Sequence, residues 1–246
     1  MSTTTMAPPK VVSREEWLSA RKELLVKEKE HIRQRDALNA ERLNLPWVKV
    51  EKTYVFDAPD GKKTLRDLFA GRSQLIIQHF MFGPGWKEGC VGCSFSADHL
   101  PGALIHLEHH DVTLVVVARA TLPELEAFKK RMGWTFPFIS SNGSDFNYDY
   151  HVSFTPEEME QGKAYYNYGW QKPDREELSG YSSFYKDAAG DIFHTYSTYA
   201  RGLEYVLGTY VFLDIAPLGR NEDHGLTDWV RHHDRYDTVK SYCGCH

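Results

Sequence analysis

Apolar positions in the first fifty residues recur at helical spacing. Ser13 is followed three residues later by Glu16, which is the capping-box signal for a helix start, and apolar residues then repeat among charged ones. These apolar residues are Trp17, Leu18, Leu24, Leu25, Ile32 and Leu38. We predict one long helix from Ser13 that ends before Pro46. Its faces are either solvated, or they form the arm of a homodimer.

From residue 47 onwards, apolar runs of strand length alternate with helical segments. The runs "QLIIQHFMF" and "VTLVVVA" are long enough for strands that are buried on both faces. Strands are predicted at 47–56, 74–82 and 112–118, and helices at 64–69, 93–109 and 123–132. The order strand, helix, strand, helix predicts a parallel sheet with right-handed crossovers.

The second half of the chain is more polar and aromatic. A loop is predicted at 140–152, an insertion at about 155–180, a hairpin at 183–196 and a closing helix at 202–213. Within the insertion, "YYNYGW" at 165–170 indicates a lid or an interface. The fold class is therefore α/β, a central sheet flanked by helices. We expect a disordered segment 1–10, one domain 11–236 that includes the helical extension, and a flexible tail 237–246.

Composition excludes several functional classes. The net charge of −5 provides no general basic field for nucleic acid or an anionic membrane. No apolar run reaches the length of a membrane-spanning helix, and residues 1–10 lack the apolar core of a signal peptide. The predicted location is the cytoplasm, with no nucleic-acid or membrane partner.

Cys90 and Cys93 form a Cys-x-x-Cys pair directly after a predicted buried strand. A thiol at a helix start meets free backbone amides, which favour the thiolate that attacks disulfides. Two intervening residues allow the second thiol to resolve a mixed disulfide at the first. We therefore assign Cys90 as the attacking thiol and Cys93 as the resolving thiol. The alternative is two buried structural cysteines.

The C-terminal residues Cys243, Cys245 and His246 form a second cluster. Thiolate and imidazole ligands suit Cu(I) or zinc, and Cys90 and Cys93 are candidates for the same metal. The tail is otherwise a flexible thiol arm, or an incidental exposed end.

Histidines near the first cysteine pair are weaker candidates. His79 and His99 are each predicted to be structural rather than catalytic or metal-binding, and His232 and His233 are predicted on the surface. The calcium-loop pattern that starts at Asp145 fails, because Tyr150 stands where glycine is needed.

The strings "FMFGPGWKEGCVGCSF", "RMGWTFPFISSNGSDFNYDYHVSF" and "DWVRHHDRY" resemble the bacterial family numbered 899 among the domains of unknown function. The stretches "VSREEWLSARKELL" and "FHTYSTYARGLE" belong to the same resemblance, which covers about Val11 to Tyr236. It implies a thioredoxin-like fold and a dithiol-disulfide oxidoreductase activity.

Two related groups add further expectations. The loop before Cys90 resembles that of peroxiredoxins, with Pro84 matching loosely, but Lys87 stands where those proteins have threonine. Ser182 is predicted at the place of the thioredoxin cis-proline. Copper-handling proteins of the Sco type pair two cysteines with a histidine, which makes His79, His194 or the tail a candidate third ligand.

The first function hypothesis is a thiol-disulfide oxidoreductase that needs no cofactor and works with a redox partner protein or a small thiol or disulfide. The alternatives are a Cu(I)-binding protein, a peroxiredoxin-like peroxidase, and a dimerisation module with structural cysteines.

Overall fold

The computed structural model describes residues 10–220, 222 and 227–236. The chain divides into two compact units, residues 1–46 and 47–246. The predicted disordered segment 1–10, apart from residue 10, and the predicted tail 237–246 lie outside the described residues. The bounds 11–236 of the domain stay a prediction.

The first unit is built on helix α1, Arg14–Leu43. The Ser13 hydroxyl accepts a hydrogen bond from the amide of Glu16 at 3.2 Å, and the Glu16 carboxylate accepts one from the amide of Ser13 at 3.0 Å. The predicted helix and its capping box are thus confirmed. No side chain of α1 is buried, so the helix relies on local interactions.

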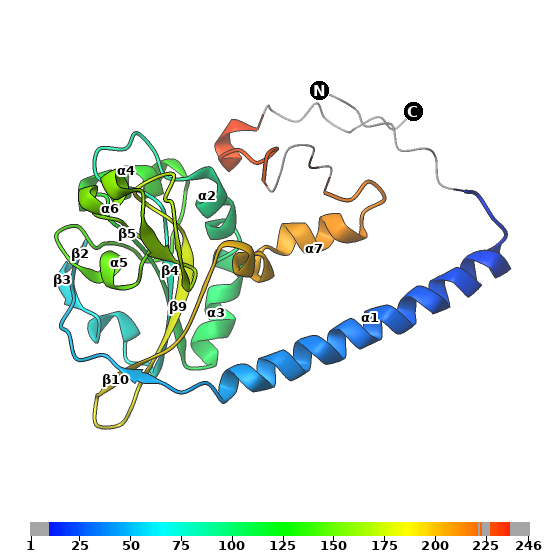
Figure 1. The fold of residues 1–246 in the computed structure, drawn as a ribbon, viewed down its shortest axis with the longest axis horizontal. Coiled ribbons are helices and arrows are strands. Elements are labelled where there is room, and N and C mark those ends of the chain that lie inside the picture. The colour runs from blue at the N-terminus through cyan, green and yellow to red at the C-terminus, as the bar shows by residue number, and fades with distance from the viewer. Residues whose placement is uncertain (1–9, 221, 223–226, 237–246) are drawn as a thin grey trace. The chain divides into compact units, whose positions relative to one another are not determined.

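The second unit contains an eight-stranded sheet in the order β1-β10-β9-β4-β5-β6-β2-β3. The strands are β1 (Val48–Lys49), β2 (Val55–Ala58), β3 (Gly61–Thr64), β4 (Gln74–His79), β5 (Val112–Ala118), β6 (Phe138–Ser140), β9 (Gly180–Lys186) and β10 (Ile192–Tyr199). Strands β4, β5 and β6 are parallel, whereas β9 is antiparallel to both β4 and β10. This is the predicted thioredoxin-like arrangement (Figure 1).

Successive side chains of the central strands point to opposite faces of the sheet, so each face has its own apolar core. Val116 of β5 points into a core shared with Phe80, Cys93 and Phe128. Its neighbour Val117 points into the other core. The first core is the one that carries the cysteine pair.

The helices and the remaining short elements connect these strands. They are η1 (Asp67–Phe69), α2 (Val91–Ala97), α3 (Pro101–His109), α4 (Leu122–Arg131), α5 (Phe146–Asp149), α6 (Pro156–Gln161), η2 (Ala200–Val206), α7 (Gly208–Ile215) and η3 (His233–Arg235). The insertion also holds a two-stranded sheet, β7 (Ala164–Tyr166) with β8 (Gly169–Gln171). None of the described helices is long and apolar enough to cross a membrane.

The structure corrects several predicted boundaries. The predicted strand 47–56 is two strands, because β1 pairs at one edge of the sheet and β2 lies near the opposite edge. The predicted helix 64–69 is only the turn η1, where the Asp67 carboxylate accepts from the amide and hydroxyl of Thr64. The closing helix is divided into η2 and α7, and the three-residue strand β6 was not predicted.

Candidate redox site at the start of helix α2

Cys90 and Cys93 lie at a strand-to-helix junction, as predicted. Strand β4 ends at His79, a ten-residue loop follows, and Cys90 is the N-cap of α2. Both thiols are free. Cys90 is partly exposed, whereas Cys93 is only 5% exposed. A reagent from solvent therefore reaches Cys90 first.

The two thiols have opposite acid strengths because they share one hydrogen bond. Hydrogen bonding to the Cys93 thiol favours the thiolate form of Cys90, and the backbone amides of Cys93 and Gly92 stabilise it further. Together they lower the pKa of Cys90 to about 6, against the opposing effect of burial. Donation to Cys90, together with burial, raises the pKa of Cys93 well above its ordinary value.

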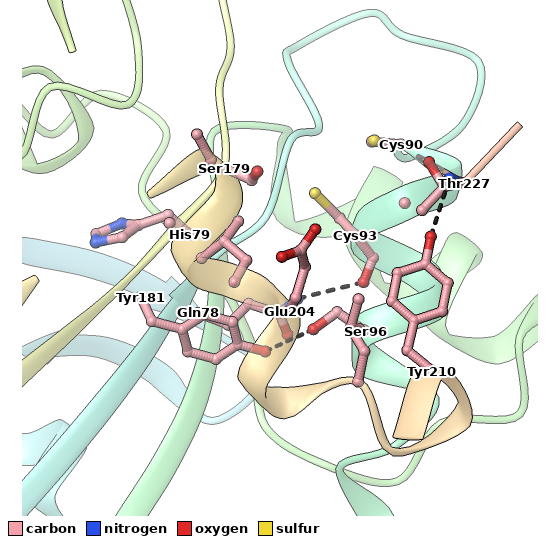
Figure 2. Close-up of a pocket in the computed structure, with 15 residues that line it drawn as sticks. Gln78, His79, Cys90, Cys93, Ser96, Ser179, Tyr181, Glu204, Tyr210 and Thr227 are labelled. Atoms are coloured by element: carbon pink, nitrogen blue, oxygen red, sulfur yellow. Dashed lines mark hydrogen bonds between the residues drawn. The ribbon is translucent and has the colours of Figure 1, made fainter. Parts of the chain in front are cut away.

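Backbone and side-chain groups fix the resolving thiol in place. The amide of Met81 lies 3.5 Å from Cys93 Sγ, and Gln78 Nε2 donates to the Cys93 carbonyl at 3.2 Å. The Ser179 hydroxyl favours the thiolate form of Cys93 and so lowers its pKa slightly, against the larger effects that raise it. Ser179 precedes β9 and faces the cysteine pair (Figure 2).

The prediction that Ser182 occupies the place of the thioredoxin cis-proline is wrong, because Ser179 is the residue that directly precedes the strand β9. Ser182 lies inside β9, opposite Ile77, and its hydroxyl is 2.7 Å from His79 Nε2. The predicted hairpin starts at residue 183, whereas β9 begins three residues earlier, at Gly180. No cis peptide bond occurs among the described residues.

Contacts with Phe80 and with His232 hold the turn that presents Cys90. The residue before it, Gly89, packs so tightly that a Cβ there would collide with the ring of Phe80. The Gly89 carbonyl accepts a hydrogen bond from His232 Nε2 at 2.9 Å. The guanidinium of Arg131 lies 3.3 Å from His232 Nδ1, so the imidazole donates with one nitrogen and accepts with the other.

His232 is therefore wrongly predicted as a surface residue. It is only 1% exposed and its ring packs edge-on against Phe128. His232 stands in the polar string "RHHDR", which is typical of a surface segment. Its neighbours His233 and Arg235 pair with Asp98 and Glu88 of the first half of the chain. His233 is exposed, as predicted, and bonds Asp98 at 2.7 Å.

A pocket of about 210 Å³ opens beside the two thiols. One wall comes from Gln78, Ser179 and Tyr181 of the sheet region (Figure 2). The lining also includes Leu203 and Glu204 of η2, Leu207 directly after it, and Tyr210 of α7. The sequence predicted a helix in this region but gave no sign that it covers the cysteines.

Tyr166 of the aromatic insertion bonds two residues that line this pocket. The hydroxyl of Tyr166 donates to the carbonyl of Ser179 at 2.7 Å and accepts from the amide of Ala200 at 3.2 Å. Ser179 and Ala200 both line the pocket. Arg175, also in the insertion, contributes a positive charge that helps to lower the Cys90 pKa. Nothing in the sequence pattern pointed to Arg175.

Among the described residues, no histidine gathers with the cysteines as a metal site. His79 lines the pocket, but Figure 2 shows its imidazole directed away from Cys93. His194 bonds Ser197 at 2.7 Å, and His99 Nε2 accepts from the amide of Thr209 at 3.0 Å, as expected of a structural histidine. Within residues 10–220, 222 and 227–236, no three His, Cys, Asp or Glu side chains gather as metal ligands. Cys243, Cys245 and His246 lie outside the described residues.

Comparison with known proteins gives one family match. The family described as "Bacterial protein of unknown function (DUF899)" matches residues 6–236. Comparison with curated proteins gives no match.

Solved structures with a similar fold include peroxiredoxins. A peroxiredoxin Q mutant from Xylella fastidiosa is 16% identical, with a TM-score of 0.39 over 63% of this chain and 86% of its own. The peroxidoxin BcpB from Mycobacterium tuberculosis is 10% identical, with a TM-score of 0.44 over 67% and 92%. A candidate protein disulfide isomerase from Bacteroides thetaiotaomicron is 20% identical, with a TM-score of 0.38 over 68% and 91%. Likeness at this level concerns the fold, and the fold assignment here rests on strand order.

Proposed function

The chain belongs to the bacterial DUF899 family, and we propose that it is a thiol-disulfide oxidoreductase in which Cys90 attacks and Cys93 resolves. One observation carries this proposal. Cys90 is partly exposed at the N-cap of α2, where Cys93 and two backbone amides stabilise its thiolate, while Cys93 is buried. A thiolate that is both accessible and stabilised is the nucleophile that disulfide exchange needs.

The chemistry proceeds in two exchanges. The Cys90 thiolate attacks one sulfur of a substrate disulfide, so that a mixed disulfide forms, and the other substrate sulfur leaves as a thiolate that takes a proton from solvent. Cys93 then loses its proton and attacks the Cys90 sulfur. The second substrate thiol leaves, and the protein holds a Cys90–Cys93 disulfide. The substrate gains two electrons, which an external thiol later restores to the protein.

The hydrogen bond between the two thiols links these exchanges. While Cys90 is a thiolate, it lowers the acidity of Cys93, because the shared proton stabilises the negative charge on Cys90. Once Cys90 enters a mixed disulfide, that charge is gone, and the pKa of Cys93 falls. The resolving thiol is therefore activated only after the first exchange has taken place.

The other hypotheses have less support at this site. Lys87, at the place of the peroxiredoxin threonine, is exposed and brings no hydroxyl to Cys90. The redox partner, the cytoplasmic location and a homodimer through α1 stay predictions.

A steady-state assay tests the proposal. The protein is mixed with dithiothreitol and hydroxyethyl disulfide, and the rate of exchange above the uncatalysed rate is measured for wild type, Cys90→Ser and Cys93→Ser. We expect catalysis in wild type and a loss of at least about 100-fold in Cys90→Ser, since serine is not ionised at neutral pH and cannot form the mixed disulfide. Circular dichroism verifies that each variant is folded.

The Cys93→Ser variant supplies the matched control. Incubated with hydroxyethyl disulfide without dithiothreitol, it should accumulate a mixed disulfide on Cys90, visible by mass spectrometry, because the resolving thiol is missing. A folded Cys90→Ser protein with the wild-type rate would overturn the proposal.

A further inference from the structure

The pocket beside the cysteines has an apolar wall. Leu203 and Leu207 come from η2 and the turn after it, and Tyr210 comes from α7. They line the same cavity as Cys93 and Gly92, so they form an apolar wall next to the dithiol. A disulfide that reaches Cys90 therefore meets this wall.

The size of the pocket limits what it holds. A cavity of roughly 150 Å³ lined by aliphatic and aromatic side chains takes up benzene. At about 210 Å³, this pocket has room for one aromatic ring or a branched alkyl group with a few additional atoms. It has no room for a folded protein loop with several side chains.

The hydroxyl groups of Ser96, Tyr181 and Tyr210 in the lining already have hydrogen-bond partners. The hydroxyls of Ser96 and Tyr181 lie 2.8 Å apart, and the Tyr210 hydroxyl accepts from the amide of Thr227 at 2.9 Å. Tyr210 also bonds the carboxylate of Glu222. A ligand therefore meets mainly the carbon surface of these side chains.

The charge of the lining selects against anions. Glu204 is the one acidic residue among the described lining residues, and none of them is Lys or Arg. Its carboxylate pairs at 2.9 Å with Arg201, which lies outside the pocket. Arg175, whose charge reaches Cys90, is not part of the lining and is itself paired with Asp174 at 2.7 Å.

We propose that this pocket binds the uncharged apolar group of a low-molecular-weight disulfide, and so selects neutral aromatic or branched disulfides over anionic ones. The inference rests on the proposed function and names its substrate class. Binding places one sulfur of the substrate beside the Cys90 thiolate. The exchange then follows the two steps already described, with the substrate reduced to two thiols.

Two aromatic disulfides that differ in charge provide the test. At pH 7, 4,4′-dithiodipyridine is neutral and 5,5′-dithiobis(2-nitrobenzoate) carries two negative charges. The second-order rate of the reduced protein with each is divided by the rate of 2-mercaptoethanol with the same reagent, which removes intrinsic reactivity. We expect the normalised rate to favour the neutral reagent by about tenfold or more, which is the selectivity typical of one well-filled apolar pocket.

Variants of the lining sharpen the test. Leu203→Asn should bring the ratio of the two normalised rates close to one, because the wall is no longer apolar. Glu204→Gln should lower the ratio by a different route, a severalfold faster reaction with the charged reagent. Val211→Asn is the control: Val211 is 59% exposed on α7, outside the pocket, and its ratio should equal that of wild type.

The outcomes separate the two proposals. Equal normalised rates for both reagents, in a wild-type protein that reduces hydroxyethyl disulfide through Cys90, would overturn the pocket assignment and leave the oxidoreductase standing. A protein that reacts with no disulfide through Cys90 would overturn both. If Leu203→Asn does not fold, Glu204→Gln still decides the question.

Discussion

Helix α1 and the turn that presents Cys90 differ in where their stabilising contacts come from. The capping bonds of α1 join Ser13 to Glu16, three residues away, and none of its side chains is buried. The turn before Cys90 is held by His232, 143 positions along the chain. A sequence pattern is sufficient to locate the first region, whereas the second needs the folded chain to bring its parts together.

The largest effect is expected where the turn is most crowded. Gly89→Ala places a methyl group against the ring of Phe80, and the overpacking should destabilise the protein by about 3 kcal/mol and displace Cys90. Urea denaturation measures the first effect, and the rate of Cys90 alkylation the second.

Gly102→Ala is the matched control for this substitution. Gly102 lies in α3, where an added Cβ meets no atom within 4 Å, so alanine should stabilise the helix by about 0.5–1 kcal/mol. If both glycine variants behaved alike, tight packing at Gly89 would not be what fixes the turn.

A smaller loss is expected when the distant anchor is removed. His232→Ala leaves the carbonyl of Gly89 without its donor and opens a gap beside Phe128, which should cost about 2 kcal/mol and speed the alkylation of buried Cys93. His233→Ala removes an exposed histidine that bonds Asp98 and should change the stability by less than about 0.5 kcal/mol. Equal effects of the two substitutions would show that His232 is not an anchor.

The smallest effect on the site is expected from α1. Ser13→Ala removes the helix cap and should cost about 1 kcal/mol of local helix stability. Hydrogen exchange of the amides at residues 14–17 should become faster, while Cys90 keeps its alkylation rate. A slower or faster Cys90 would mean that α1 contributes to the site.

The same contrast explains which parts of the structure were predictable. Strand β5 is Val112–Ala118 as predicted, because a continuous apolar run is a local signal. The position of Cys90 at a helix start was predictable for the same reason, from the strand before it and the helix after it. The division of residues 47–56 into β1 and β2 was not, because it depends on which strands pair at each edge of the sheet.

Within the site, the sequence identified the two thiols but not the groups that distinguish them. Ser179 bonds Cys93, and His232 and Arg175 act on the Cys90 side. All three lie in polar stretches that read as loops or surface. Their role depends on tertiary contacts, for which a one-dimensional pattern gives no signal.

The central claim is that Cys93 activates Cys90 by donating a hydrogen bond to its sulfur. The direct test is the pH dependence of Cys90 carbamidomethylation by iodoacetamide, followed by peptide mass spectrometry in wild type and Cys93→Ala. Only the thiolate reacts, so the rate rises with pH up to the pKa and levels off above it. We predict a midpoint near pH 6 in wild type, and a midpoint at higher pH in Cys93→Ala because the donor is lost. A wild-type midpoint at the ordinary cysteine value of about 8.5, or no change in Cys93→Ala, would contradict the account.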